Sequence, residues 1–166
     1  HTISEEGRPL RLLQEQWLAA GMAQVVPRHG NSACVERLLK AETGARRETL
    51  GLWKNHRIFG TNQLKLLNGA AGTYVIAEGR IVSLGKTRNT RYLNFGRYWK
   101  RDFTATVPVS MEADFEKALA RDQLALDDLA GRAVRLRGVV EVRDGPLIKL
   151  THPGQLIVLD GEKDKK

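Results

Sequence analysis

The residues best suited to binding chemistry lie in one basic and aromatic segment near the middle of the chain. Between Lys86 and Arg101 the sequence holds six basic side chains and no carboxylate. Extended to Phe103, the segment also holds five of the ten aromatic residues. Binding to a single nucleic-acid strand requires cations near the phosphates and flat side chains on which bases stack, each stacked base contributing roughly 1–3 kcal/mol. The segment therefore predicts a surface for nucleic acid, with single strands favoured.

Each residue type in this segment has an expected role. Phosphate contacts are expected from the basic residues and stacking from three aromatic ones, while Asn94 is expected to donate hydrogen bonds to base edges. The predicted phosphate contacts are Lys86, Arg88, Arg91, Arg97, Lys100 and Arg101, and the predicted stacking residues are Tyr92, Tyr98 and Trp99. Of the remaining aromatic residues, Phe95 or Phe103 is expected to point inward, because aromatic residues in strands usually belong to the core. Weak sequence preference and strong salt dependence should follow.

The elements that position this segment are predicted to be strands, because apolar and polar residues alternate from Tyr74 onward. Strands are expected over 74–84, 91–95, 103–109, 134–143, 146–150 and 155–159, with a short helix from about residue 110. Gly79 is expected to form a bulge that bends the first strand, and Asp144-Gly145 is a hairpin signal. Strand, strand, strand, short helix, strand, strand is the order of the OB-fold, a five-stranded Greek-key barrel. The segment then lies on the second and third strands, the usual binding face of that fold.

The first third of the chain predicts helices instead. Leu13, Trp17 and Leu18 share one stripe of a helix that ends near Gly21, and a second helix is expected over 32–50. The predicted fold class is therefore α+β, a helical segment followed by an OB-fold-like barrel with one short helix. The expected domains are a helical segment over 1–54, a linker over 55–72, an OB-fold-like domain over 73–160 and a charged tail over 161–166.

Composition limits the remaining possibilities. The chain has 166 residues and a formal net charge of +8, and its apolar fraction of 42% suffices for a core. No stretch of about 18 apolar residues runs without a charge, so no membrane partner is expected. Cys34 is the sole cysteine, which excludes an internal disulfide and a multi-cysteine zinc site. The carboxylates at 112–116 and 127–128 are expected to cap helices and turns rather than to act as catalytic pairs.

Two sets of residues resemble the staphylococcal-nuclease-like (thermonuclease) family. Leu18-Ala-Ala-Gly-Met-Ala-Gln-Val25 and the later series from Leu38 to Gly51-Leu-Trp53 are similar to the C-terminal helices of that family's domain. A second set is similar to an OB-like C-terminal extension of some bacterial members: Tyr92-Leu-Asn-Phe-Gly96 with Trp99, Asp102-Phe-Thr104, Gly145-Pro146 and the His152-Pro153 segment. The resemblance predicts a partial nuclease-like domain joined to an OB-like domain.

The resemblance implies a calcium-dependent phosphodiesterase in the intact parent protein. The family's catalytic carboxylates and arginines lie mostly before the region that matches here, so no catalytic residue carries over. This chain is expected to be non-catalytic and to hold no cofactor or metal, calcium being possible in the parent. Residues 1–53 are expected to pack on the OB-like domain, on a second copy or on the parent's N-terminal part, with Trp17 and Trp53 as anchors. The resemblance favours a secreted or cell-envelope protein; the residues themselves leave the compartment unknown.

Two alternative functions remain open from the same residues. In one, the chain is part of a nuclease that is active only in the intact parent and uses this module to hold substrate. In the other, it is a structural or protein-interaction module whose positive face meets an acidic partner. Replacing Tyr92, Tyr98 and Trp99 by Ala distinguishes stacking from a purely electrostatic partner, because only stacking requires the rings.

Overall fold

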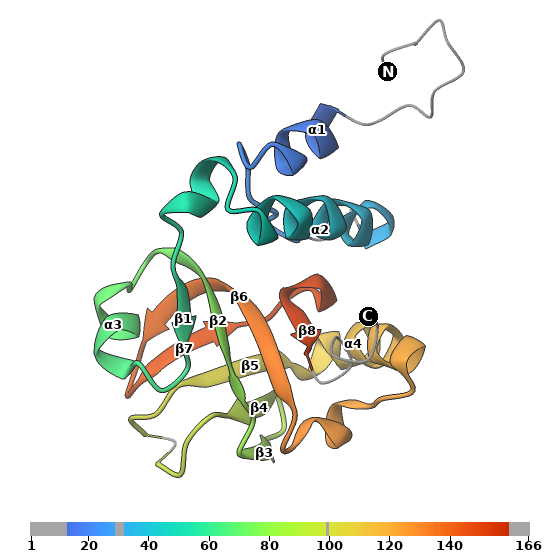
Figure 1. Ribbon diagram of the computed structural model, residues 1–166. Helices are drawn as coiled ribbons and strands as arrows, with labels where there is room; N and C mark the ends of the chain where they lie inside the picture. Colours follow the sequence, from blue (N-terminus) through green and yellow to red (C-terminus); the bar gives the residue numbers. More distant parts are fainter. Residues whose placement is uncertain (1–12, 29–31, 99, 160–166) are drawn as a thin grey trace, which may run out of the picture. The chain divides into compact units, whose positions relative to one another are not determined.

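The computed structural model describes residues 13–28, 32–98 and 100–159. The chain divides into two compact units, His1–Arg57 and Ile58–Lys166. The first unit is helical and the second is built mainly of strands (Figure 1). The predicted charged tail lies outside the described residues.

The helical unit is a pair of helices followed by a 3-10 helix. Helix α1 spans Leu13–Ala19, α2 spans Ser32–Arg47 and η1 spans Gly51–Lys54. Helices α1 and α2 pack against each other, and Arg37 of α2 forms an ion pair with buried Glu15 of α1. The buried face of α1 holds Glu15 and Leu18, which lie three positions apart. Leu13 and Trp17 lie outside this face and are 55% and 51% exposed. The expected apolar stripe is therefore wrong except at Leu18.

The two tryptophans expected to anchor this unit differ in burial. Trp53 is buried, and its indole lies 4.6 Å from the His56 ring, centroid to centroid. Trp17 is half exposed on a helix of only seven residues. Only Trp53 has the burial that an anchor requires.

The second unit contains one eight-stranded sheet. Its strands are β1 (Ile58–Gly60), β2 (Tyr74–Arg80), β3 (Ser83–Lys86), β4 (Thr90–Asn94), β5 (Thr104–Pro108), β6 (Ala133–Val142), β7 (Pro146–Lys149) and β8 (Leu156–Val158). The hydrogen-bonded order is β1-β2-β6-β7-β5-β4-β3, and β8 also pairs with β6. Strands β1 and β2 are parallel, as are β5 and β7, and the other pairs are antiparallel.

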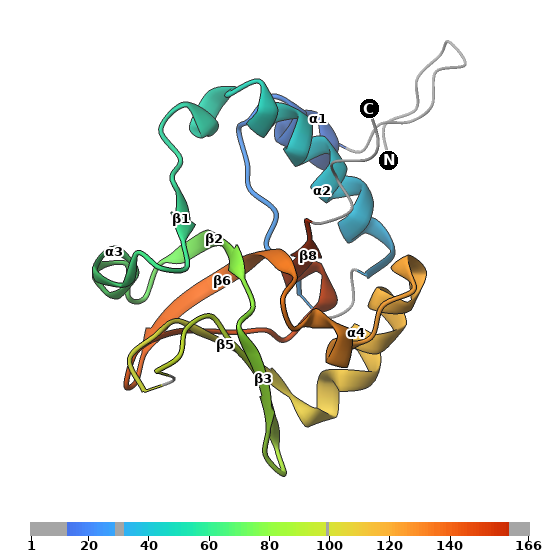
Figure 2. The same cartoon turned by 60° about the horizontal axis from the view of Figure 1, so that its bottom comes forward.

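Short helices connect these strands. They are α3 (Leu64–Gly69), α4 (Glu112–Leu119) and the 3-10 helices η2 (Val109–Met111), η3 (Ala120–Asp122), η4 (Leu126–Leu129) and η5 (Pro153–Gln155). Helix α4 lies between β5 and β6 in the chain, as the predicted order requires. Figures 1 and 2 show α4 on the opposite side of this unit from the loop that joins β4 to β5.

The α+β class is confirmed, whereas a closed five-stranded barrel is not. Among the described residues the end strands of the hydrogen-bonded order, β1 and β3, do not pair with each other. The single strand expected over 74–84 is interrupted, and β3 begins three residues after β2 ends. The segment 55–72, expected to be a linker, contributes β1 and α3 to the sheet-containing unit. The sequence did not predict β1 because a three-residue strand is too short to show alternation.

Gly79 serves close packing rather than a bulge. The register between β2 and β6 continues unbroken through the pair Gly79 and Val134, so no extra residue is inserted. A Cβ at Gly79 would overlap the side chain of Thr61, which follows β1. The bulge prediction is wrong, and the absent side chain allows Thr61 to pack directly against β2.

The core determines which side chains face outward. Leu93 of β4 and Phe103 are fully buried, together with Phe115 of α4 and Ile148 of β7. Half-buried Phe95 packs on Phe103, with ring centroids 5.2 Å apart. Because successive side chains of a strand point to opposite faces, the even-numbered residues of β4 face away from this core.

Candidate nucleic-acid interface

One row of side chains crosses four strands on the outward face of the sheet. The register pairs Gly85 of β3 with Tyr92 of β4, Tyr92 with Thr106 of β5, and Thr106 with Lys149 of β7. Side chains at paired positions lie on the same face. This row therefore presents, in order across the sheet, the glycine without a side chain, the Tyr92 ring, the Thr106 hydroxyl and the Lys149 ammonium group.

A second row lies beside the first. It pairs Ser83 with Asn94, Asn94 with Thr104, Thr104 with Leu147 and Leu147 with Glu141. The Asn94 side-chain amide donates a hydrogen bond to the Ser83 hydroxyl at 3.2 Å. Asn94 thus faces outward as predicted, next to the ring of Tyr92 two residues earlier.

A groove of about 320 Å³ follows these two rows. Tyr92, Asn94, Thr104, Thr106 and Lys149 line it. Its volume is at the lower end of the range for small-molecule pockets, roughly 300–1,000 Å³. A polar floor with one aromatic ring suits a planar polar group such as a nucleobase.

The end of the groove is formed by two connections that contact each other. A Cβ at Gly145, in the β6–β7 turn, would lie 2.6 Å from the carbonyl of Arg101 in the β4–β5 loop. Figures 1 and 2 show this turn and this loop side by side. The loop is also tied by Asp102, whose carboxylate accepts a 2.8 Å hydrogen bond from the backbone N–H of Tyr98. The predicted Asp144-Gly145 hairpin is confirmed, and its glycine permits this close contact.

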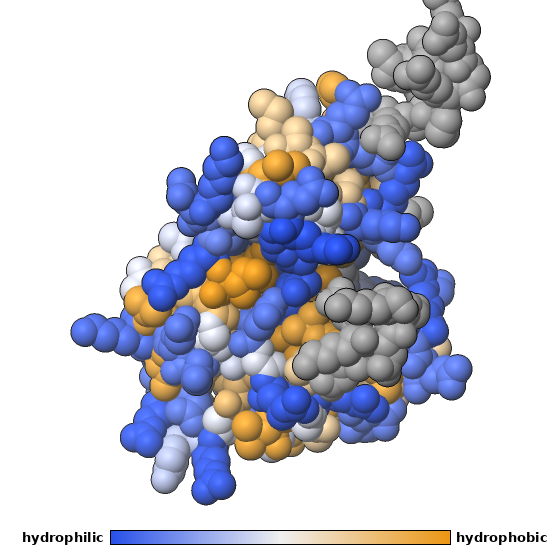
Figure 3. All heavy atoms as spheres, in the orientation of Figure 1, coloured by the Kyte–Doolittle hydropathy of each residue, from blue (hydrophilic) through white to orange (hydrophobic). Residues whose placement is uncertain are grey.

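The β4–β5 loop presents cations and an aromatic ring to solvent. Arg97, Lys100 and Arg101 are exposed, and Tyr98 is 60% exposed. The guanidinium carbon of Arg101 lies 4.2 Å from the centroid of the Tyr98 ring, a cation–π contact. In Figure 3, hydrophilic side chains project from the lower left of the sheet-containing unit, where Figure 1 places this loop. Trp99 lies outside the described residues.

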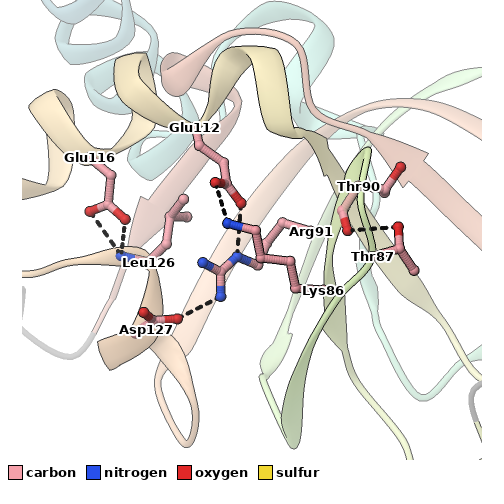
Figure 4. Close-up of polar contacts among 8 residues, drawn as sticks. All are labelled: Lys86, Thr87, Thr90, Arg91, Glu112, Glu116, Leu126 and Asp127. Atoms are coloured by element: carbon pink, nitrogen blue, oxygen red, sulfur yellow. Dashed lines mark hydrogen bonds and ion pairs between the residues drawn. The ribbon is translucent and has the colours of Figure 1, made fainter.

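Four charged side chains form a group that we call the Arg91 cluster (Figure 4): Lys86, Arg91, Glu112 and Asp127. Arg91 lies on the face of β4 opposite to Tyr92 and therefore points away from the groove. Arg91 donates through Nε to Glu112 at 3.1 Å and through Nη1 to Asp127 at 2.5 Å. Lys86 donates through Nζ to the other oxygen of Glu112 at 2.7 Å. Arg91 is only 9% exposed, whereas Lys86 stays exposed. The structure therefore does not support the predicted phosphate contact of Arg91.

The Arg91 cluster shifts the pKa values of Arg91 and Glu112. The hydrogen bond from Lys86 is the largest cause that lowers the pKa of Glu112; burial opposes it, and Arg91 adds to the lowering. Burial on its own would lower the pKa of Arg91, but hydrogen bonds and charges from Asp127 and Glu112 outweigh it and raise that pKa. The carboxylates at 112 and 127 thus act as ion-pair partners, where the sequence predicted helix and turn caps.

Three further arginines on the sheet strands and their turns are Arg88, Arg135 and Arg137. Arg88 is exposed in the β3–β4 turn. Arg135 pairs with Glu78 across β2 and β6 at 2.6 Å, and Arg137 is almost fully buried. Arg88 alone of these three offers an exposed cation.

Sequence reasoning missed the residues that β6, β7 and their turn contribute to the groove. They are Glu141, Arg143, Asp144, Gly145, Pro146, Leu147 and Lys149. Their alternation with buried residues was visible, but the face on which they lie depends on the parallel pairing of β5 with β7. That pairing joins segments about forty positions apart and leaves no local signal in the sequence.

The structure adds two findings on other kinds of site. Among the described residues, no three His, Cys, Asp or Glu side chains gather closely enough to hold a metal ion. In the same residues, no helix combines the length and apolar character needed to cross a bilayer.

Comparisons with known proteins give distant structural similarities. No family model matches the chain, and no curated protein matches it. The fold is similar to the OBody AM1L10 bound to hen egg-white lysozyme, with 17% identity over 55% of this chain and 83% of that one, at a TM-score of 0.37. Aspartyl tRNA synthetase from Entamoeba histolytica matches with 15% identity over 58% of this chain and 20% of that one, at 0.39. The S. pombe Stn1-Ten1 complex matches with 12% identity over 55% and 61%, at 0.37. The resemblance to the staphylococcal-nuclease-like family stays a prediction.

Proposed function

We propose that this chain is a binding module for single-stranded nucleic acid that uses the outward face of β4, β5 and β7. Bases stack on Tyr92 in the groove, and phosphates meet the cations of the loops beside it. The observation that carries the proposal is the row from Gly85 through Tyr92 and Thr106 to Lys149 along the groove. It combines a ring, hydrogen-bonding groups and a cation on one continuous face, as single-strand binding requires.

The neighbourhood of Tyr92 suits stacking. Its cross-strand neighbour on β3 is Gly85, so no side chain covers the ring from that strand. A Cβ at Gly85 would come to 3.6 Å from the Cβ of Tyr92, an ordinary packing distance. Because Tyr92 is partly exposed and projects from a strand rather than a loop, its ring is held in place before a base arrives.

The phosphate contacts come from exposed cations around the groove. Arg97, Lys100 and Arg101 project from the β4–β5 loop and Arg88 from the β3–β4 turn. Each phosphate that these cations neutralise releases counterions, so affinity falls as salt rises, with a logarithmic slope of about −0.7 per contact for single strands.

The test is a fluorescence anisotropy titration with a labelled single strand of about 12 nucleotides of mixed sequence, a length within the range that one OB-fold binds. We expect the affinity to fall at least tenfold between about 50 and 200 mM salt. Tyr92→Ala should weaken binding by about tenfold or more, because one stacked base is lost. Trp17→Ala, which removes a more exposed ring from the helical unit, is the control and should stay within about twofold of the unchanged protein. Affinity independent of salt and of Tyr92 would contradict the proposal.

A second candidate is a protein-interaction module for an acidic partner, favoured by the exposed Arg97, Lys100 and Arg101. Such a partner needs the cations but not the rings. Replacing Tyr92 and Tyr98 by Ala distinguishes the two functions: an electrostatic partner keeps its affinity, whereas a stacked strand loses it.

A further inference from the structure

Four charged side chains in the groove have no partner among the residues that the structure describes. Glu141, Arg143, Asp144 and Lys149 line the groove, and none of their side chains has a hydrogen bond or ion pair within the described part of the chain. The Arg91 cluster, by contrast, uses every one of its charges in an ion pair. Because these side chains are exposed, their acceptors and donors are available to a ligand whose edge presents hydrogen-bond donors and acceptors.

The balance of charge inside the groove disfavours phosphates on its floor. Its lining includes the carboxylates of Asp102, Glu141 and Asp144 against the cations Arg143 and Lys149. A phosphate deep in the groove would be repelled by the larger number of carboxylates. The exposed cations of the β4–β5 loop lie outside the groove lining. Phosphates therefore run along the loops, and base edges enter the groove.

We infer that Glu141 and Asp144 make this groove selective for guanine in single-stranded nucleic acid, an inference that rests on the proposed function. Carboxylates only accept hydrogen bonds, so they favour bases whose edges donate. Guanine presents an N1–H and an N2 amino group side by side, which match the two oxygens of one carboxylate in a charge-assisted, bidentate contact. Thymine and uracil present one N–H between two carbonyl oxygens. A carboxylate that accepts this N–H brings its second oxygen close to a carbonyl oxygen, and the two repel each other. Adenine and cytosine present one amino group beside a ring nitrogen acceptor and are intermediate.

The positions of the two carboxylates fit this role. Glu141 lies on the outward face in the row that also holds Thr104 and Asn94, and Asp144 lies in the β6–β7 turn at the end of the groove. Asp102 is already used, because its carboxylate accepts the backbone N–H of Tyr98. A base that enters the groove from the strand stacked on Tyr92 therefore meets Glu141 and Asp144 as the groove carboxylates without a hydrogen bond among the described residues.

The experiment compares three labelled DNA strands of about 12 nucleotides, all thymine except for one central position that holds thymine, guanine or hypoxanthine. A single guanine avoids four-stranded assemblies, and hypoxanthine lacks only the N2 amino group. We expect guanine to raise the affinity about tenfold over thymine, the size of one good bidentate contact. Hypoxanthine should lose most of that gain.

Variants test the assignment to the two carboxylates. The double variant Glu141→Gln with Asp144→Asn should abolish the preference for guanine while keeping the affinity for the all-thymine strand. Asp114→Asn removes an exposed carboxylate of α4 instead and should leave the preference unchanged. Equal affinity for the three strands overturns the inference but leaves the proposed function intact. A guanine preference that survives in the double variant also overturns it, and no binding to any strand overturns both.

Discussion

The Arg91 cluster and the β4–β5 loop hold cations from the same short segment, yet they end in opposite states. Arg91 and Lys86 meet Glu112 and Asp127, which come from elements that follow later in the chain. Arg97 and Arg101 meet no such carboxylates within the described part of the chain and stay exposed. The difference shows that the density of positive charge in a segment does not decide whether a cation is available to a ligand. The acidic residues that other elements bring to it decide that.

The face of β4 on which a residue lies is the second difference between the two regions. On β4, Arg91 and Leu93 point toward the core side, whereas Tyr92 and Asn94 point outward. A one-residue change of register would exchange these sets. The core residue Leu93 therefore fixes which residues face the groove, and the following predictions test that division.

The largest effect is expected from breaking the Arg91 cluster. Arg91→Met leaves Glu112 and Asp127 without their common partner and should lower the free energy of unfolding by about 2–3 kcal/mol, measured by urea denaturation. The affinity of the folded variant for a single strand should stay within about twofold, because Arg91 does not face the groove. Arg97→Met is the control and should show the reverse pattern, with little loss of stability and weaker binding. Weak binding without destabilisation in Arg91→Met would contradict this division.

The next effect is expected from covering the ring of Tyr92. In Gly85→Leu a side chain on the neighbouring strand lies over the position that a base would occupy, so affinity should fall about tenfold. Gly85→Ala adds only a methyl group at an ordinary contact distance and should bind nearly as the unchanged protein does. Anisotropy titrations of both variants check this, and equal affinities for the two would show that the base does not stack on Tyr92.

A smaller effect is expected from removing one loop cation. Arg97→Gln should reduce the logarithmic salt slope of binding by about 0.7 and the affinity by a few-fold, since one phosphate contact is lost. Lys54→Gln removes an exposed cation of the helical unit and serves as the control. The slope is measured by titrations at several salt concentrations, and an unchanged slope for Arg97→Gln would remove it from the interface.

The smallest effect concerns acid stability. The pKa of Glu112 in the folded protein lies below its ordinary value of 4.5. Its ionised form therefore stabilises the fold above that pH, and this stabilisation is lost as the pH falls through the lowered value. Glu112→Gln should be less stable than the unchanged protein near neutrality, and the gap should narrow below about pH 4.5 in urea denaturation at stepped pH. A gap that does not change with pH would show that Glu112 is not held ionised by the Arg91 cluster.

Local pattern predicted much of the sheet but less of the interface. The strands β4, β5 and β6 and helix α4 were expected near their observed bounds, because alternation and turn residues are local signals. The short β1 and the buried face of α1 were not, since a three-residue strand and a seven-residue helix carry too little periodicity. Tyr92 and Asn94 were placed on the outward face correctly, whereas the pairing of Arg91 with Glu112 and the contribution of Lys149 depend on long-range contacts that no local pattern contains.

The most direct test of the account is an NMR titration of the full chain with a single strand of mixed sequence, following backbone amide shifts. The account predicts that the largest shifts occur on the outward face and its loop, at Tyr92, Thr106, Lys149 and Arg97, while α4 and the helical unit change little. Shifts centred on α4 or on the helical unit, or no shifts at saturating strand, would contradict it.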